Sequence, residues 1–150
     1  MPPGVAEKET RMSLAFPSDE WIAAYKEAIN GNPEYRTGAA EWTHGVVALI
    51  ARAQPPAIPL DIGIWLDLDR GVCRNARLVT VEEAQKAPFC ISGEYARWKQ
   101  VLRKQLDPIK GMMQGKLRLK GDLPTIVRFV KAAQELVNSG GLVDTRFLDE

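Results

Sequence analysis

The chain has 150 residues, of which 45% are hydrophobic and 26% are charged, and its formal net charge is +1. These values are typical of a single globular domain and argue against a disordered or membrane-embedded chain. The near-neutral charge gives no overall field that would attract nucleic acid. Short apolar runs and a polar N-terminus predict a cytoplasmic protein without a spanning helix or a secretory signal.

The N-terminal part predicts an arm, a helix and a shorter helical piece. Residues 1–15 combine prolines, a glycine and charges, and we expect them to form a flexible arm. The helix starts after Ser18, whose hydroxyl can cap the first turn, and it ends before Pro33. Its apolar side chains recur at helical spacing: Trp21, Ile22, Tyr25 and Ile29. A short helical piece is expected over Pro33–Ala40.

The middle of the chain changes to strand periodicity. Apolar and β-branched residues fill Trp42–Arg52, and a proline pair stops this predicted strand. Aliphatic and mostly polar residues then alternate over Ile58–Asp69, which is the pattern of a half-buried strand. Asp69-Arg70-Gly71 has the composition of a hairpin turn, so we expect Val72–Thr80 to return antiparallel.

Short strands and helices alternate after the hairpin. Residues 81–87 favour a short helix, and Phe89–Ser92 is predicted to be a strand. Glu94–Leu106 is predicted to be an amphipathic helix, because its apolar residues share one face and its basic residues share the other. The apolar face consists of Tyr95, Trp98, Val101, Leu102 and Leu106.

The C-terminal part predicts a short helix, a strand and a long helix. Asp107 can cap the short helix with Pro108 in its first turn, and Gly115 ends it before a strand over residues 116–120. The last helix starts after Asp122 and has a wider apolar arc than packing on one sheet requires. This arc consists of Leu123, Ile126, Val127, Phe129, Val130, Ala133, Leu136 and Val137. Residues 140–150 form a tail.

Residues 111–116 contain two glycines followed by a lysine, as a phosphate-binding loop does, but the spacing of the glycines differs from that of such a loop. Three residues separate Gly111 from Gly115 where the motif has four, and Leu117 stands where a hydroxyl residue would bind magnesium. The predicted elements also have the wrong order, because a phosphate-binding loop leads from a strand into a helix. The sequence therefore argues against a nucleotide site.

Neither a catalytic triad nor a metal site is predicted. His44 is the single histidine, and we expect a structural or exposed residue on a strand. Cys73 and Cys90 lack CxxC spacing and are expected to be reduced and buried. The predicted set of catalytic residues, metals and cofactors is therefore empty.

Two groups of charged residues lie on predicted strands. Asp61, Asp67 and Asp69 share one strand face, and their spacing fits a solvated face better than a pair of catalytic carboxylates. A basic stripe, Lys116, Arg118 and Lys120, has no interleaved aromatic residue, so solvation is favoured over nucleic-acid binding. Attraction to an anionic headgroup or phospholipid surface stays open for this stripe.

Three motifs follow one another at particular distances: WLDLDRG at residues 65–71, FCIS at 89–92 and DPIKGMMQGKLRLKGD at 107–122. In this order they give the segment 63–136 a resemblance to the sterol carrier protein 2 family. The last motif resembles that family's most recognisable block, in which an apolar pair and Gln-Gly-Lys-Leu precede a basic/apolar alternation and Gly-Asp.

The resemblance implies an α+β fold in which helices cover one face of a five-stranded mixed β-sheet, with a hydrophobic tunnel between the layers. It also implies a module without catalytic residues that binds sterols, fatty acids, fatty acyl-CoAs or phospholipids. The lipid-binding domain is predicted over residues 16–139. Because the chain ends in Leu148-Asp149-Glu150 instead of a Ser-Lys-Leu-like tripeptide, import into peroxisomes is not expected.

The residues themselves also favour a void, because several wide apolar helix faces compete for one aliphatic sheet face. Methionines are flexible and suit a ligand-facing wall, although Met112 and Met113 could instead fill gaps in an ordinary core. The resemblance favours the wall. The predicted lipid-binding residues are Ile109, Met112, Met113, Leu123, Ile126, Val127 and Val130, with Trp98 and Leu102 at the edge of the void.

The predicted function is therefore non-catalytic binding and transfer or presentation of a lipid, including acyl chains and isoprenoids. Expected partners are the lipid, a lipid-metabolising enzyme or a membrane surface, with no nucleic acid, and the protein is a monomer or a homodimer. An interaction module that docks a partner protein or a second copy is the first alternative. An accessory module that presents lipid substrates to an enzyme is another, and an enzyme acting on its own is third.

Overall fold

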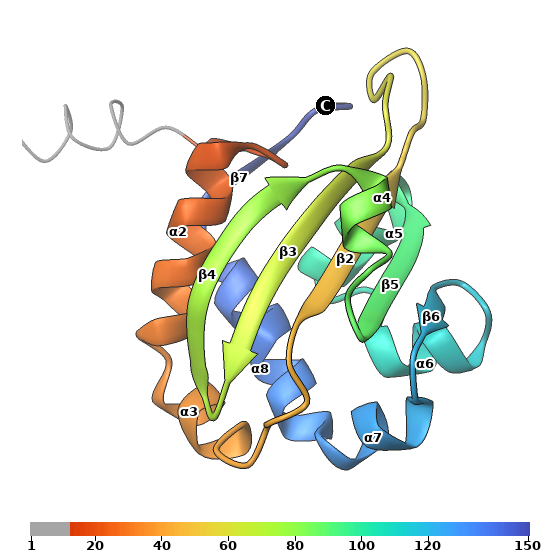
Figure 1. The fold of residues 1–150 in the computed structure, drawn as a ribbon. Helices are drawn as coiled ribbons and strands as arrows, with labels where there is room; N and C mark the ends of the chain where they lie inside the picture. The colour runs from red at the N-terminus through yellow and green to blue at the C-terminus, as the bar shows by residue number, and fades with distance from the viewer. Residues whose placement is uncertain (1–12) are drawn as a thin grey trace, which may run out of the picture.

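The computed structural model describes residues 13–150, and a five-stranded sheet lies at its centre (Figure 1). The strand order is β4-β3-β2-β5-β6, and β2 pairs parallel with β5 while the other neighbours are antiparallel. The strands are β2 (Val47–Arg52), β3 (Ile62–Asp69), β4 (Val72–Val79), β5 (Phe89–Glu94) and β6 (Arg118–Lys120). The predicted α+β fold with a mixed five-stranded sheet is confirmed.

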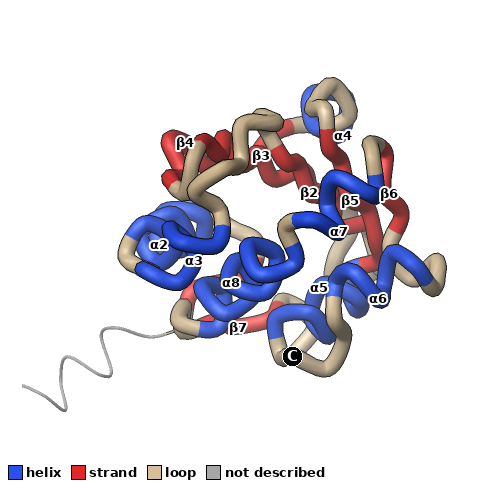
Figure 2. Tube along the Cα trace, turned by 90° about the horizontal axis from the view of Figure 1, so that it is seen from below, coloured by secondary structure: helices blue, strands red, loops and turns tan. Residues whose placement is uncertain are grey.

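Most helices form a layer on one face of the sheet, here called the inner face (Figure 2). This layer contains α2 (Asp19–Asn30), α3 (Pro33–Gly38), α5 (Tyr95–Leu102), α6 (Pro108–Met113), α7 (Leu123–Arg128) and α8 (Val130–Gly141). The short helix α4 (Val81–Ala84) lies on the opposite, outer face (Figure 1). Each helix in residues 13–150 falls short of the length and apolar content that crossing a bilayer requires.

Local signals in the sequence set the starts of several elements. The Ser18 hydroxyl accepts a hydrogen bond from the Trp21 amide at 3.1 Å, and the Asp107 carboxylate accepts from the first turn of α6. Arg70 and Gly71 both have positive φ, at 48° and 84°, so they form the tight turn that joins β3 to β4. The predicted helix starts and the predicted hairpin are confirmed.

Several predicted elements have other bounds in the structure. The strand predicted over Ile58–Asp69 begins at Ile62, and Leu60, predicted on its aliphatic face, is 72% exposed. The helix predicted over Glu94–Leu106 ends at Leu102. The first strand begins at Val47 instead of Trp42, since Gly45 has φ 89° and interrupts an extended chain, and His44 is therefore exposed in a loop. The long last helix is divided, because Phe129, with φ −109° and ψ 40°, is not helical. The helical phase is therefore not continuous from α7 to α8.

The two ends of the described chain meet. β1 (Leu14–Phe16) pairs parallel with β7 (Thr145–Phe147), so the last residues of the predicted arm and part of the predicted tail lie in strands. The rest of that arm, residues 1–12, lies outside the described residues. The division of the chain at residues 15 and 140 stays a prediction.

Each face of the sheet has its own apolar cluster. The cluster on the inner face is large and joins the sheet to the helix layer. The cluster on the outer face is small and consists of Ala48, Ile50, Ala84, Ala87 and Cys90. Cys73 and Cys90 are buried free thiols, as predicted, and burial raises the pKa of the Cys73 thiol to about 11.

Candidate functional site

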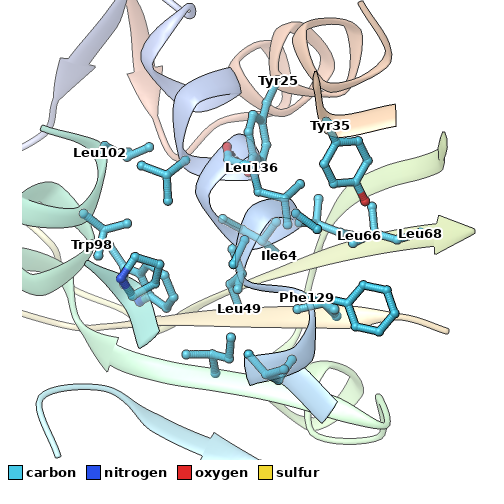
Figure 3. A pocket seen from close by; sticks show the side chains of 18 of the residues that line it. Tyr25, Tyr35, Leu49, Ile64, Leu66, Leu68, Trp98, Leu102, Phe129 and Leu136 are labelled. Carbon is cyan, nitrogen blue, oxygen red and sulfur yellow. Dashed lines mark hydrogen bonds between the residues drawn. The ribbon is translucent and has the colours of Figure 1, made fainter. Parts of the chain in front are cut away.

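A cavity of about 110 Å³ lies between the inner face of the sheet and the helix layer. Leu49 of β2 and Ile64, Leu66 and Leu68 of β3 form its floor, and Leu136 of α8 lies on the helix side (Figure 3). It lies between the layers, where the resemblance implies a tunnel. A tunnel through the molecule stays a prediction.

Strand alternation decides which residues reach the cavity. Along β2, Val47, Leu49 and Ala51 line it, whereas Ala48 and Ile50 belong to the cluster on the outer face. Successive side chains of a strand point to opposite faces, so β2 contributes every second residue to the cavity.

Aromatic rings build the side walls: Phe16, Trp21, Tyr25, Tyr35, Trp42, Trp98 and Phe129. The Trp98 indole N–H donates to the Ile50 carbonyl at 2.8 Å, and the Tyr25 hydroxyl donates to the Leu136 carbonyl at 3.0 Å. Because these polar atoms are bonded within the protein, the rings present apolar surface to the cavity. Burial raises the pKa of both tyrosines, so their phenols are neutral.

The cavity offers a hydrocarbon environment and no reactive group. Among the described residues that line it, none has an ionisable side chain other than the two neutral tyrosines. An engineered apolar cavity of about 150 Å³ stays dry and binds benzene, so this space suits an apolar group of similar size. A longer hydrocarbon must continue through an opening or move the helices apart.

The predicted site residues divide into two groups. Four line the cavity: Trp98, Leu102, Met112 and Ile126. Five do not line it: Ile109, Met113, Leu123, Val127 and Val130. Met113, Val127 and Val130 have exposed fractions of 68%, 44% and 45% and face away from the core. Direct contact between these nine residues and a bound lipid stays a prediction.

Sequence reasoning did not assign the floor to the site, and Trp98 is the one aromatic wall residue that it predicted. The alternation over Ile58–Asp69 identified one aliphatic strand face, and Ile64, Leu66 and Leu68 on that face could have been chosen as the floor. Trp42 and Tyr35 carry no comparable signal, because long-range packing alone brings α3 and the following loop to the cavity.

The three aspartates on the predicted strand face have structural partners. Asp67 forms an ion pair with Arg74 at 3.0 Å, and Asp61 accepts the Ala53 amide at 2.7 Å. Asp69 pairs with Arg70 at 3.5 Å. Within residues 13–150, no group of three or more histidine, cysteine, aspartate or glutamate side chains is placed to hold a metal ion.

Comparison with known proteins identifies similar chains. A family model described as the SCP-2 sterol transfer family matches residues 25–134. A crystal structure of sterol carrier protein 2 is 35% identical with a TM-score of 0.76, covering 84% of this chain and 97% of that one. A conserved hypothetical protein of Thermus thermophilus, described as possibly a sterol carrier protein, is 33% identical with a TM-score of 0.76, covering 86% and 90%.

A more distant structure shares the fold alone. UbiJ-SCP2, described as a ubiquinone synthesis protein, is 14% identical with a TM-score of 0.51, covering 91% of this chain and 95% of that one. A comparison with curated proteins gives no match.

Proposed function

This chain belongs to the SCP-2 sterol transfer family of lipid-binding domains, and we propose that it binds a lipid with a long hydrocarbon chain and transfers or presents it unchanged. The observation that carries the proposal is the apolar cavity. In its aromatic walls, the polar atoms of Trp98 and Tyr25 form hydrogen bonds to backbone carbonyl groups of the protein. Such a cavity solvates hydrocarbon and has no group that could attack it. We therefore assign no catalytic residue.

The hydrophobic effect supplies enough free energy for this function. Burial of a methylene group gains about 0.8 kcal/mol, so about ten methylenes gain ~8 kcal/mol, which corresponds to micromolar affinity before ordering costs. Fatty acids, isoprenoids and other lipids with an extended chain all meet this requirement. A flat, rigid sterol needs a wider opening of the helix layer than a single chain does.

We propose an anionic membrane surface as the place where the lipid is exchanged. Residues 108–131 contain six basic side chains and one acidic side chain, although the whole chain has a net charge of only +1. The exposed apolar side chains of Met113, Val127 and Val130 lie in the same segment as the exposed Lys116 and Arg128. Apolar residues among cations suit the interface of an anionic bilayer.

Presentation of the lipid to an enzyme is the alternative, and it is supported by the fold shared with UbiJ-SCP2. Sedimentation with vesicles separates the two partners. Transfer at a membrane requires stronger binding to vesicles that contain phosphatidylglycerol than to phosphatidylcholine vesicles. Binding to neither kind of vesicle contradicts the membrane proposal and favours an enzyme partner.

Lipid extraction tests the function itself. The purified protein is denatured in solvent, and its lipids are counted and identified by mass spectrometry beside an Ala51→Leu variant, which fills the cavity. We expect close to one lipid per wild-type chain, or uptake of one palmitate by delipidated protein, and much less in the variant. A wild-type protein that neither carries lipid nor takes up palmitate contradicts the proposal.

A further inference from the structure

A second pocket of about 170 Å³ shares lining residues with the apolar cavity, and we call it the polar pocket because four of its seven lining residues have polar side chains. Its walls come from α8 and from the connection between α5 and α6. The lining residues are Lys104, Leu106, Asp107, Pro108, Gln134, Val137 and Asn138. Pro108 and Val137 line both spaces. These two side chains therefore form the partition between an apolar interior and a polar exterior pocket.

Lys104 is the one cation among the residues that line the polar pocket. Its Cε lies 3.8 Å from the place where a Cβ on Gly141 would stand, so the side chain extends from the end of α5 to α8. No ion pair holds Lys104 within residues 13–150, whereas the Asp107 carboxylate accepts the amides of Ile109 and Lys110. The lysine charge is therefore available to a ligand.

The backbone at Lys104 is in the left-handed region, with φ 60°. It follows the last turn of α5, where its amide donates to the Val101 carbonyl at 3.0 Å. Glycine is the usual residue at such a helix end, and a residue with a side chain is less favourable there. A lysine thus occupies a position where glycine would make the fold more stable, and an unfavourable conformation of this kind is typical of functional sites.

We propose that the polar pocket binds the anionic group of a lipid whose hydrocarbon chain occupies the apolar cavity, with Lys104 as the residue that recognises the charge. This inference rests on the proposed function. The chain passes between Pro108 and Val137, and the anionic group stays at the solvent-facing side of that partition. An ammonium group binds a carboxylate or a phosphate as a point charge, so both are suitable anions.

Three ligands with the same hydrocarbon tail test this assignment: palmitate, hexadecyl phosphate and hexadecanol. Their affinities are measured for the delipidated wild-type protein and for Lys104→Gly. We expect the variant to bind the two anions about tenfold more weakly and hexadecanol equally well, because one charge-assisted hydrogen bond is lost. Its Tm should rise, because glycine relieves the left-handed backbone. A loss for palmitate alone or for the phosphate alone identifies which anion the pocket recognises.

Arg70→Gly is the matched control, because Arg70 is the other described non-glycine residue with positive φ and lies in the distant β3–β4 turn. It should raise the Tm without changing any of the three affinities. Equal weakening of hexadecanol and palmitate by Lys104→Gly, or no weakening, overturns the assignment while the proposed function stands. A wild-type protein that binds none of the three ligands contradicts the proposed function itself.

Discussion

The two faces of the central sheet are covered in different ways, although they share the same strands. On the outer face, small side chains allow α4 to approach closely, and Ala48 and Ala84 have no exposed surface. On the inner face, wide aromatic rings separate the helices from Leu49 and its neighbours, and a cavity remains. The void thus results from large rigid side chains, not from a shortage of apolar residues.

The rings on the inner face are also fixed at their edges. The Trp98 and Tyr25 hydrogen bonds hold each ring at the cavity wall, so the rings cannot rotate freely to fill the space. A close-packed face resists added volume, whereas a face with a preformed cavity can accept it from a ligand or from a substitution. This difference can be tested from both sides of the sheet.

The largest expected effect comes from a charge on the inner side. Met112→Glu places a carboxylate at the cavity wall, and we expect a loss of at least about a hundredfold in affinity for a fluorescent fatty acid, because an ionised group is costly in an apolar space. Leu60→Glu is the control, since Leu60 is 72% exposed, does not line the cavity and should leave this affinity unchanged. Circular dichroism verifies both folds. Equal losses in both variants contradict the placement of Met112 in the wall.

An intermediate effect is expected from adding volume to either face of β2. Ala51→Leu extends into the cavity and should weaken fatty-acid binding about tenfold while changing the free energy of unfolding by less than about 1 kcal/mol. Ala48→Leu enters the close-packed cluster and should lower the free energy of unfolding by about 1–3 kcal/mol. Urea unfolding measures both. Similar destabilisation by the two variants would show that the faces are packed alike.

The smallest expected effect is on pH dependence. A hydrogen bond from Asn32 at 3.1 Å lowers the pKa of the buried Glu135 carboxyl on α8 below its ordinary value of 4.5. The ionised carboxylate therefore stabilises the fold above pH 4.5, and this stabilisation is lost as the pH falls from 4.5 through the lowered pKa. Glu135→Gln should therefore lose less of its free energy of unfolding than the wild type does on acidification to about pH 3.

Glu83 lies in α4, the helix on the outer face of the sheet, and provides the control for that experiment. Arg77 lowers the pKa of the Glu83 carboxyl as well, through an ion pair of 2.7 Å, but both side chains are exposed. Solvent screens such a pair, so Glu83→Gln should follow the wild-type acid profile closely. If the free energy of unfolding depends less on pH in Glu83→Gln than in Glu135→Gln, the larger contribution of Glu135 is contradicted.

Local chemistry explains which parts of the fold were predictable from the sequence. The cap at Ser18, the proline after Asp107 and the turn at Arg70 and Gly71 act over a few residues, and each is found where the sequence predicts it. The parallel pairing of β2 with β5 joins distant segments, and no local pattern identifies that partner. A mixed sheet was expected only because the family resemblance implied one, and this particular pairing was not predicted.

The site was harder to predict because its walls depend on helix phase. A continuous last helix would put Ile126, Val127 and Val130 on one apolar arc, but the non-helical Phe129 changes the phase. Ile126 and Phe129 line the cavity as a result, while Val127 and Val130 are exposed. Composition indicated surplus apolar surface, and only the backbone at Phe129 decides which of it is internal.

The central claim is that hydrocarbon occupies the inner face and not the outer one. The most direct measurement is a set of intermolecular nuclear Overhauser effects between isotope-labelled palmitate and the protein's methyl groups. Cross-peaks from the palmitate chain to Leu49, Ile64 and Leu136 are expected, with none to Ile50 on the outer face. Cross-peaks to Ile50, or none to the three cavity residues when palmitate is bound, would contradict this account.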